Sequence, residues 1–156
     1  KRQGVKTRFI ELAGEVNQSM PEYVVHIVAK ALNAAEKSIR SSRILMLGLA
    51  YKSNVDDTRE SPSFKLIDLL LEEGAIIDYY DPHVDKIPKI RKYPELSGKK
   101  SAEWNEETIR SFDLVLVSTA HDSVNYQELG QWAEVIVDTR NAMSEVTGAT
   151  AQIYPA

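Results

Sequence analysis

Two cations lie in one long loop that follows the first apolar run of the sequence, residues 44–50. The loop carries Lys52 and Arg59 and ends at Ser61-Pro62, a pair typical of a helix start, where backbone N–H groups have no partner within the helix. A connection of about a dozen residues is longer than the usual 2–6, and long loops in compact domains are often functional. Two cations beside free helix amides favour an anion site for a phosphate or diphosphate. The alternative is that both cations pair with carboxylates on a solvated loop, namely Asp56, Asp57 and Glu60.

A third cation, Arg140, follows a later apolar run, residues 135–137. In open α/β sheets, ligands bind beyond the carboxyl ends of the strands. Arg140 is therefore expected at the same sheet edge as Lys52, where it would be a second contact to a nucleotide. The alternative is an ion pair between Arg140 and Asp138.

Two further polar groups also follow apolar runs. His121-Asp122 could be an acid/base pair, but a polar cluster at a strand end is the favoured interpretation. Asp81, His83 and Asp85 alternate along the chain, yet a metal site needs more ligands than these with supporting spacing. We therefore predict no metal site here.

The apolar pattern predicts an α/β fold: a Rossmann-like open parallel sheet flanked by helices. Continuous apolar runs are typical of strands buried on both faces of a parallel sheet, and strand–helix–strand units connect such strands through right-handed crossovers. The segment 83–100 is expected to form a loop with a short helix and a solvated Lys-rich face, and Tyr79, Tyr80 and Trp104 are expected to pack. The expected strands are 43–49, 75–80, 114–117 and 135–137, with 153–154 as a candidate last strand, and the expected helices are 61–73, 105–111 and 126–129.

A long helix is expected before the sheet. Ser19 and Glu22 resemble a capping box with Pro21 in the first turn, which predicts a helix over 21–38. The segment 7–16 is also compatible with a helix, so a kink or break is expected near Met20-Pro21. A long apolar helix face outside a doubly wound domain needs a partner, either another domain or another subunit.

The composition excludes several classes of protein. The 156 residues carry a net charge of −4, which argues against a general nucleic-acid binder. There is no cysteine, so disulfides, thiolate metal sites and a cysteine nucleophile are excluded within the chain, which fits a reducing cytoplasm. No apolar stretch reaches the roughly 20 residues of a membrane span. No signal peptide is visible, and the absence of an initiating Met suggests a fragment.

The sequence also lacks the glycine fingerprint of dinucleotide binding. No two of its seven glycines are two positions apart, so there is no Gly-x-Gly-x-x-Gly. The domain is therefore expected to have Rossmann topology without the NAD-binding role.

The loop 48–62, Gly-Leu-Ala-Tyr-Lys-Ser-Asn-Val-Asp-Asp-Thr-Arg-Glu-Ser-Pro, closely resembles the signature that opens the C-terminal, UDP-binding domain of the UDP-glucose/GDP-mannose dehydrogenase family. Residues 74–82 and 135–141 resemble the second and closing strands of that domain. Residues 7–17 with Met20-Pro21 resemble the family's central helical region. The similarity covers roughly residues 5–146 and is greatest to the UDP-N-acetylglucosamine or UDP-N-acetylmannosamine 6-dehydrogenases.

This resemblance implies an enzyme that oxidises the hydroxymethyl group of a UDP-sugar to a carboxylate with two NAD⁺, in surface-glycan synthesis. In such enzymes an N-terminal Rossmann domain binds NAD, a cysteine carries the intermediates, the C-terminal domain closes over UDP, and the central helix makes the dimer. For this chain it implies a helical linker and dimerisation segment over 1–40 and a UDP-binding domain over 41–156. It also implies a homodimer, whereas the net charge and the short apolar stretches argue against a nucleic-acid or membrane partner.

The resemblance assigns roles to individual positions. Tyr51 and Lys52 would contact the nucleotide sugar, with Lys52 near the diphosphate; Arg140 would contact the UDP portion, and Arg59 would reach NAD bound by the other domain. No catalytic residue is expected in this chain, because the family's cysteine and Gly-rich motifs lie upstream of it. The chain is therefore expected to be an inactive C-terminal fragment. The alternatives are a fragment of a UDP-glucose 6-dehydrogenase or a silent dimerisation module.

Overall fold

The computed structural model describes residues 3–156 and the surroundings of side chains from residue 7 onward. The α-helices are α1 (Gln3–Ala34), α2 (Pro62–Glu72), α3 (Glu106–Arg110) and α4 (Tyr126–Trp132), with one short 3₁₀ helix, η1 (Pro94–Leu96). The strands are β1 (Arg43–Leu47), β2 (Ile76–Tyr80), β3 (Leu114–Val117), β4 (Val135–Asp138) and β5 (Gln152–Pro155). Each strand and helix expected from residue 43 onward is present, with ends shifted by a few residues.

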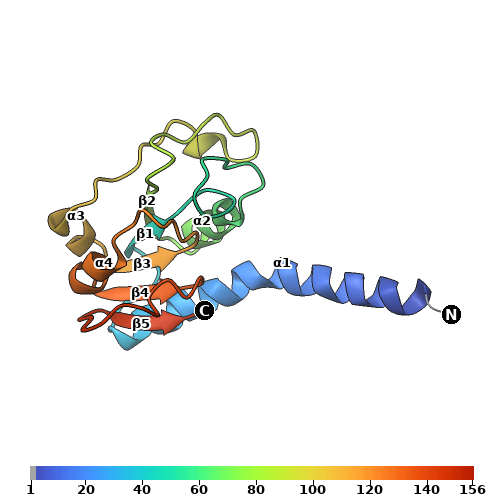
Figure 1. The fold of residues 1–156 in the computed structure, drawn as a ribbon, viewed down its shortest axis with the longest axis horizontal. Helices are drawn as coiled ribbons and strands as arrows, with labels where there is room; N and C mark the ends of the chain where they lie inside the picture. Colours follow the sequence, from blue (N-terminus) through green and yellow to red (C-terminus); the bar gives the residue numbers. More distant parts are fainter. Residues whose placement is uncertain (1–2) are drawn as a thin grey trace.

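All five strands form one parallel sheet in the order β2-β1-β3-β4-β5. Figure 1 shows this sheet with helices on both sides and α1 extending away from it. The α/β fold with a parallel open sheet and a long N-terminal helix is therefore confirmed. Because every strand points the same way, the loops that follow β1, β2, β3 and β4 gather at one edge of the sheet.

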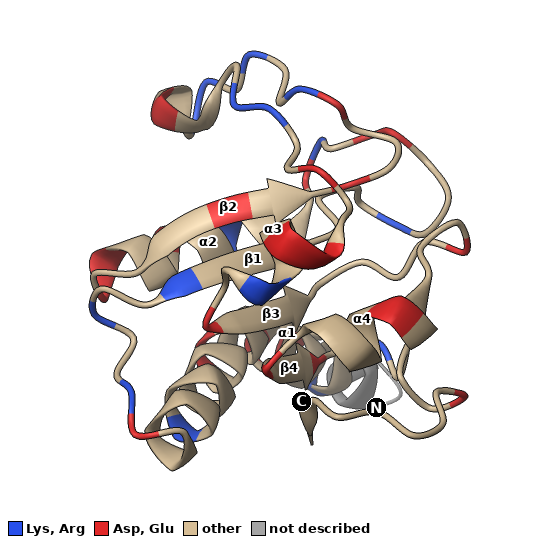
Figure 2. Ribbon diagram, turned by 90° about the vertical axis from the view of Figure 1, so that its left-hand side faces the viewer, with Lys and Arg blue, Asp and Glu red and all other residues tan. Residues whose placement is uncertain are grey.

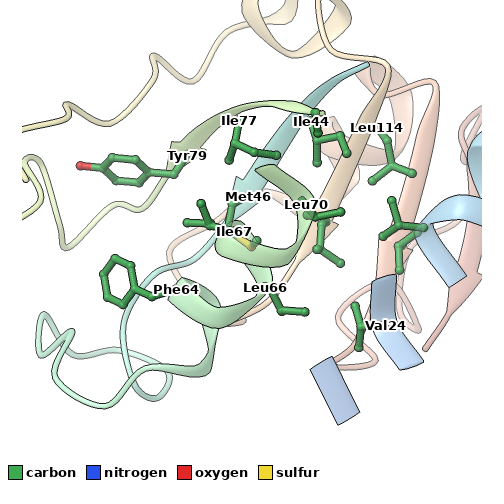
Figure 3. Packing of buried hydrophobic residues seen from close by; sticks show 14 of the residues in the cluster. Val24, Ile44, Met46, Phe64, Leu66, Ile67, Leu70, Ile77, Tyr79 and Leu114 are labelled. Atoms are coloured by element: carbon green, nitrogen blue, oxygen red, sulfur yellow. The ribbon is translucent and has the colours of Figure 1, made fainter. Parts of the chain in front are cut away.

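Alternation along the strands divides the core into two layers. Ile44 and Met46 of β1 face α1 and α2, whereas Leu45 and Leu47 face α3 and α4. Successive side chains of a strand point to opposite faces, so a strand covered on both faces must be apolar throughout. Figure 3 shows the first layer, in which Leu66, Ile67 and Leu70 of α2 and Val24 of α1 pack against the sheet.

Local signals set most helix ends. Ser61 caps α2 by accepting from the Ser63 N–H at 3.3 Å, and Asn105 caps α3 by accepting from the Thr108 N–H at 2.8 Å. Gly74 has a φ of 90° and follows the end of α2. A left-handed residue after the last turn stops a helix, and glycine adopts it without strain.

The expected break near Met20-Pro21 is wrong, because α1 is continuous from Gln3 to Ala34 with Pro21 inside it. Ser19 does not cap a helix there, since its Oγ donates to the Val16 carbonyl at 2.9 Å. A proline removes one N–H bond, here to the carbonyl of Asn17. Asn17 is exposed, so water can satisfy that carbonyl, and the helix persists.

The two halves of α1 differ in burial. Residues 7–20 are exposed, whereas Val24, Val28, Ala31 and Leu32 are buried against α2 and the sheet. Of the helices in residues 3–156, none combines the length and apolar composition that crossing a bilayer requires.

The segment after β2 forms a loop anchored by Tyr79. The Tyr79 hydroxyl donates to the carbonyls of Val84 and Lys99, and burial raises the pKa of Tyr79 to about 12. The rings of Tyr80 and Trp104 pack with centroids 4.9 Å apart, as expected. Acidic and basic residues both occur along this loop, which supports a solvated charged face (Figure 2).

Candidate functional site

The loop after β1 begins with a close approach between two backbones. Gly48 has a φ of 89°, and its N–H donates to the Tyr80 carbonyl at 2.8 Å. A Cβ atom at this position would lie 2.3 Å from the carbonyl oxygen of Thr119, in the loop after β3. Only glycine therefore lets the loops after β1 and β3 meet.

A buried polar pair lies beneath these loops. Asp81, after β2, and His121, after β3, are joined by Nε2 and Oδ2 at 2.9 Å, and both side chains are inaccessible to solvent. Asp122 bonds instead to Asn54, which donates to it from Nδ2 and accepts its N–H. This arrangement matches the interpretation of His121-Asp122 as a polar cluster at a strand end.

Arg59 is engaged within its own loop. Its Nε and a terminal nitrogen donate to the two oxygens of Asp57, at 3.0 and 2.8 Å. These bonds lower the pKa of Asp57 to about 2 and raise that of Arg59. For Arg59 the ion-pair alternative thus describes the structure, although its side chain stays 87% exposed.

Lys52 behaves differently from Arg59. Within the described part of the chain it forms no ion pair, and its side chain is exposed. The carboxylates of its own loop, Asp56, Asp57 and Glu60, therefore do not neutralise its charge. The ion-pair alternative does not describe Lys52.

Arg140 bonds to backbone rather than to Asp138. Its Nε donates to the Ser118 carbonyl at 2.8 Å. The Asp138 carboxylate accepts the N–H groups of Arg140 and Met143 instead, so the ion-pair alternative is not what the structure shows. Among the described residues, the terminal nitrogens of Arg140 have no partner, which leaves them free to donate to oxygens of a ligand.

Tyr51 and Arg140 line one cavity of about 600 Å³, walled on one side by α1. Lys52, next in sequence to Tyr51, is not part of its lining, and Arg59 lines a separate cavity of about 810 Å³ with residues 88–93. The structure therefore brings Tyr51 and Arg140 together and places Arg59 apart. The other lining residues of the smaller cavity are Asn17, Met20, Pro21, Val24, Glu60, Pro62, Leu66, Ser118, Thr139 and Ala156.

Sequence reasoning missed two kinds of lining residue. Ser118 and Thr139 directly follow β3 and β4, so the rule that ligands bind at strand ends could have found them. Asn17 and Met20 come from α1, and no pattern in the sequence indicates that this helix passes the carboxyl edge of the sheet.

Comparisons with known proteins identify the family of this domain. Residues 45–145 match the UDP-glucose/GDP-mannose dehydrogenase family, UDP binding domain. A UDP-N-acetyl-D-mannosamine dehydrogenase of Methanococcus maripaludis is 39% identical over 116 residues, which cover 74% of this chain and 24% of that protein.

Solved structures agree with this match. A UDP-D-ManNAc dehydrogenase from Pyrococcus horikoshii has a TM-score of 0.71 at 27% identity, covering 92% of this chain and 32% of that chain. An NDP-N-acetyl-D-galactosaminuronic acid dehydrogenase from Methanosarcina mazei has a TM-score of 0.72 at 27% identity, covering 92% and 30%. The chain thus spans about a third or less of the length of these relatives. It belongs to the UDP-glucose/GDP-mannose dehydrogenase family and contains that family's UDP-binding domain.

Proposed function

We propose that this chain binds the UDP part of a UDP-sugar at the carboxyl edge of its sheet. In this role it is the C-terminal portion of an NAD-dependent nucleotide-sugar 6-dehydrogenase. The observation that carries the proposal is the shared cavity of Tyr51 and Arg140, in a domain that matches the family's UDP-binding domain over residues 45–145.

The available donors suit a nucleoside diphosphate. With respect to the residues that the structure describes, Lys52 supplies an unpaired ammonium next to Tyr51 in sequence, and Arg140 has free terminal N–H groups for phosphate or base oxygens. The Tyr51 side chain is 56% exposed and offers an aromatic ring to the nucleotide sugar. We therefore assign substrate contacts to Tyr51, Lys52 and Arg140.

The substrate is proposed to be a UDP-N-acetylhexosamine, converted to the corresponding uronate. Support comes from the UDP-N-acetyl-D-mannosamine dehydrogenases among the relatives. UDP-glucose is the alternative, since a UDP-glucose 6-dehydrogenase of Haloferax volcanii is 30% identical over 122 residues. We expect no dehydrogenase activity from these 156 residues alone, because none of them is a cysteine.

The described residues do not fit NAD as a resident cofactor. The turn after β1 carries one glycine, Gly48, and Thr119 already occupies the space beside it. The turn therefore offers no cradle for a pyrophosphate. We propose that a separate NAD-binding domain of a cytoplasmic enzyme supplies the cofactor, and that Arg59 reaches it after releasing Asp57.

We also propose that α1 joins two copies of the chain. Phe9, Leu12, Val16, Met20 and Tyr23 are 42–75% exposed and recur every three or four residues on one face of the helix. The part of α1 that carries most of this apolar stripe extends beyond the sheet (Figure 1), and the stripe favours residues 1–40 as a linker and dimerisation segment. The same stripe is what favours the second candidate function, a silent dimerisation module.

Titration calorimetry with UDP tests the proposed function. We expect saturable binding by the wild-type chain, and Lys52→Ala should weaken it by about 1.5–3 kcal/mol, because one charge-assisted hydrogen bond is lost. Lys65→Ala is the matched control, since Lys65 lies on α2 and pairs with Asp68. A folded wild-type chain that gives no heat at millimolar UDP would refute UDP binding and leave the dimerisation module.

A further inference from the structure

We propose that Asp81 and His121 form a buried latch that positions Tyr51 and Lys52. The inference rests on the proposed function for its consequence, because those two residues are assigned to the nucleotide sugar. Neither Asp81 nor His121 lines the cavity of Tyr51 and Arg140, so any effect that they have on the ligand is indirect.

Asp81 holds the start of the loop. Its Oδ2 accepts the N–H groups of Leu49 and Ala50 at 2.8 and 3.1 Å, while its Oδ1 accepts the His83 N–H at 2.8 Å. The residue is only 2% exposed. Backbone N–H groups bonded to a buried carboxylate are costly to release, because a buried N–H left without a partner is not compensated for its desolvation.

His121 holds the loop further along. Its Nδ1 lies 2.9 Å from the backbone nitrogen of Asn54 and accepts that N–H. Nδ1 must therefore carry a lone pair, which leaves the proton on Nε2 to be donated to Asp81. A single neutral tautomer satisfies both bonds, so the pair specifies one arrangement of the loop.

The stretch between these anchors is short. Residues 51–53 are bounded by Leu49 and Ala50 on one side and by Asn54 on the other. Asn54 has a φ of 66°, a conformation that asparagine tolerates better than most residues. The latch thus fixes both ends of the segment that presents Tyr51 and Lys52, and these two side chains remain exposed above it.

Three substitutions distinguish a positioning role of the Asp81–His121 pair from a role in packing alone. His121→Gln keeps an amide donor near the Nε2 position for Asp81 but removes the acceptor for Asn54. His121→Asn keeps an acceptor near the Nδ1 position but loses contact with Asp81. Asp81→Asn weakens the anchors of Leu49 and Ala50. The matched control is Asp113→Asn, since Asp113 accepts the Arg43 N–H at the opposite end of β1.

The test measures amide hydrogen exchange of Asn54, the protonated ring nitrogen of His121 by NMR, and UDP affinity in each variant. We expect a wild-type His121 protonated on Nε2. His121→Gln should speed exchange at Asn54 and raise the Kd for UDP about tenfold, whereas Asp113→Asn should change that Kd less than about twofold. In both the exchange rate at Asn54 and the Kd for UDP, His121→Asn should be nearer to wild type than His121→Gln, although His121→Asn removes more buried volume. A role in packing alone predicts the reverse order.

Unchanged exchange at Asn54 in His121→Gln would overturn the latch. Faster exchange with an unchanged Kd for UDP would overturn its positioning role. A wild-type chain that does not bind UDP would remove that role together with the proposed function, and exchange at Asn54 would still decide whether the latch exists.

Discussion

Among the single residues of the site, Arg59 differs most from its proposed role, because its guanidinium is bonded within its own loop. A side chain that is to reach a cofactor in another domain is bonded to Asp57 through both oxygens. Exposed ion pairs stabilise proteins little, so a pyrophosphate could replace Asp57 at low cost. In this structure Asp57 holds the guanidinium in one orientation.

We expect Arg59→Ala to raise the pKa of Asp57 from about 2 toward its usual 3.8, because hydrogen bonds from Arg59 are the main cause of the lowered pKa. Because the pKa of Asp57 is lower in the folded state than in the unfolded state, its ionisation stabilises the fold at pH values above the unfolded-state pKa. That contribution is lost as the pH falls from about 4 to 2. Carboxylate NMR titration measures the change. Arg110→Ala, which removes the partner of Glu106, is the control and should leave Asp57 unaffected. An equally low pKa in Arg59→Ala would show that another group controls Asp57.

Residue types at the site could be predicted from the sequence, but their pairings could not. Lys52, Arg59 and Arg140 were expected at one sheet edge because each follows a strand. The sequence places His121 next to Asp122, whereas its bonded partner Asp81 lies 40 positions away. Periodicity describes the face of an element and contains no information on which strand-end side chains meet.

At the scale of elements, polar caps and apolar runs predicted the sheet and the starts of α2 and α3. The expected helix end at 38 is wrong by four residues, because α1 ends at Ala34. Glu36 takes the left-handed conformation there, with a φ of 60°, and the Lys37 N–H bonds to the Leu32 carbonyl. This is the pattern of a helix end that usually carries glycine, so its sequence signal was absent.

Gly48 and Gly14 provide a paired prediction about elements. Gly48→Ala should lower the free energy of unfolding by about 2–5 kcal/mol, because it combines a left-handed conformation with overpacking against Thr119. Gly14→Ala, with nothing within 4 Å in an exposed helix, should be neutral or raise it by up to about 1 kcal/mol. Urea unfolding measures both. Equal stability of Gly48→Ala and wild type would contradict the close approach of the two loops.

In the whole molecule, α1 combines a half that is buried in the core with a half that is exposed. Its C-terminal half completes the core, and its exposed half carries the apolar stripe. The α/β fold could be predicted because the three central strands, β1, β3 and β4, are largely apolar and buried on both faces. The continuity of α1 could not, since a proline is tolerated where water reaches the freed carbonyl.

We expect the chain to sediment as a dimer at twice its 17.5 kDa mass. Val16→Glu should shift it to a monomer, because it places a charge within the apolar stripe. Gln18→Glu adds the same charge on the opposite face of α1 and should leave the dimer intact. A wild-type monomer at high concentration would exclude α1 as a dimer interface for these residues.

NMR mapping can show whether UDP binds at the carboxyl edge of the sheet. On titration of the isotope-labelled chain with UDP, we predict that amide shifts move together in the loop 49–60 and at residues 139–141, around the cavity of Tyr51 and Arg140. Residues at the opposite edge, such as Arg43 and Asp113, should not move. Shifts confined to that opposite edge, or none at saturating UDP in a folded chain, would contradict the account.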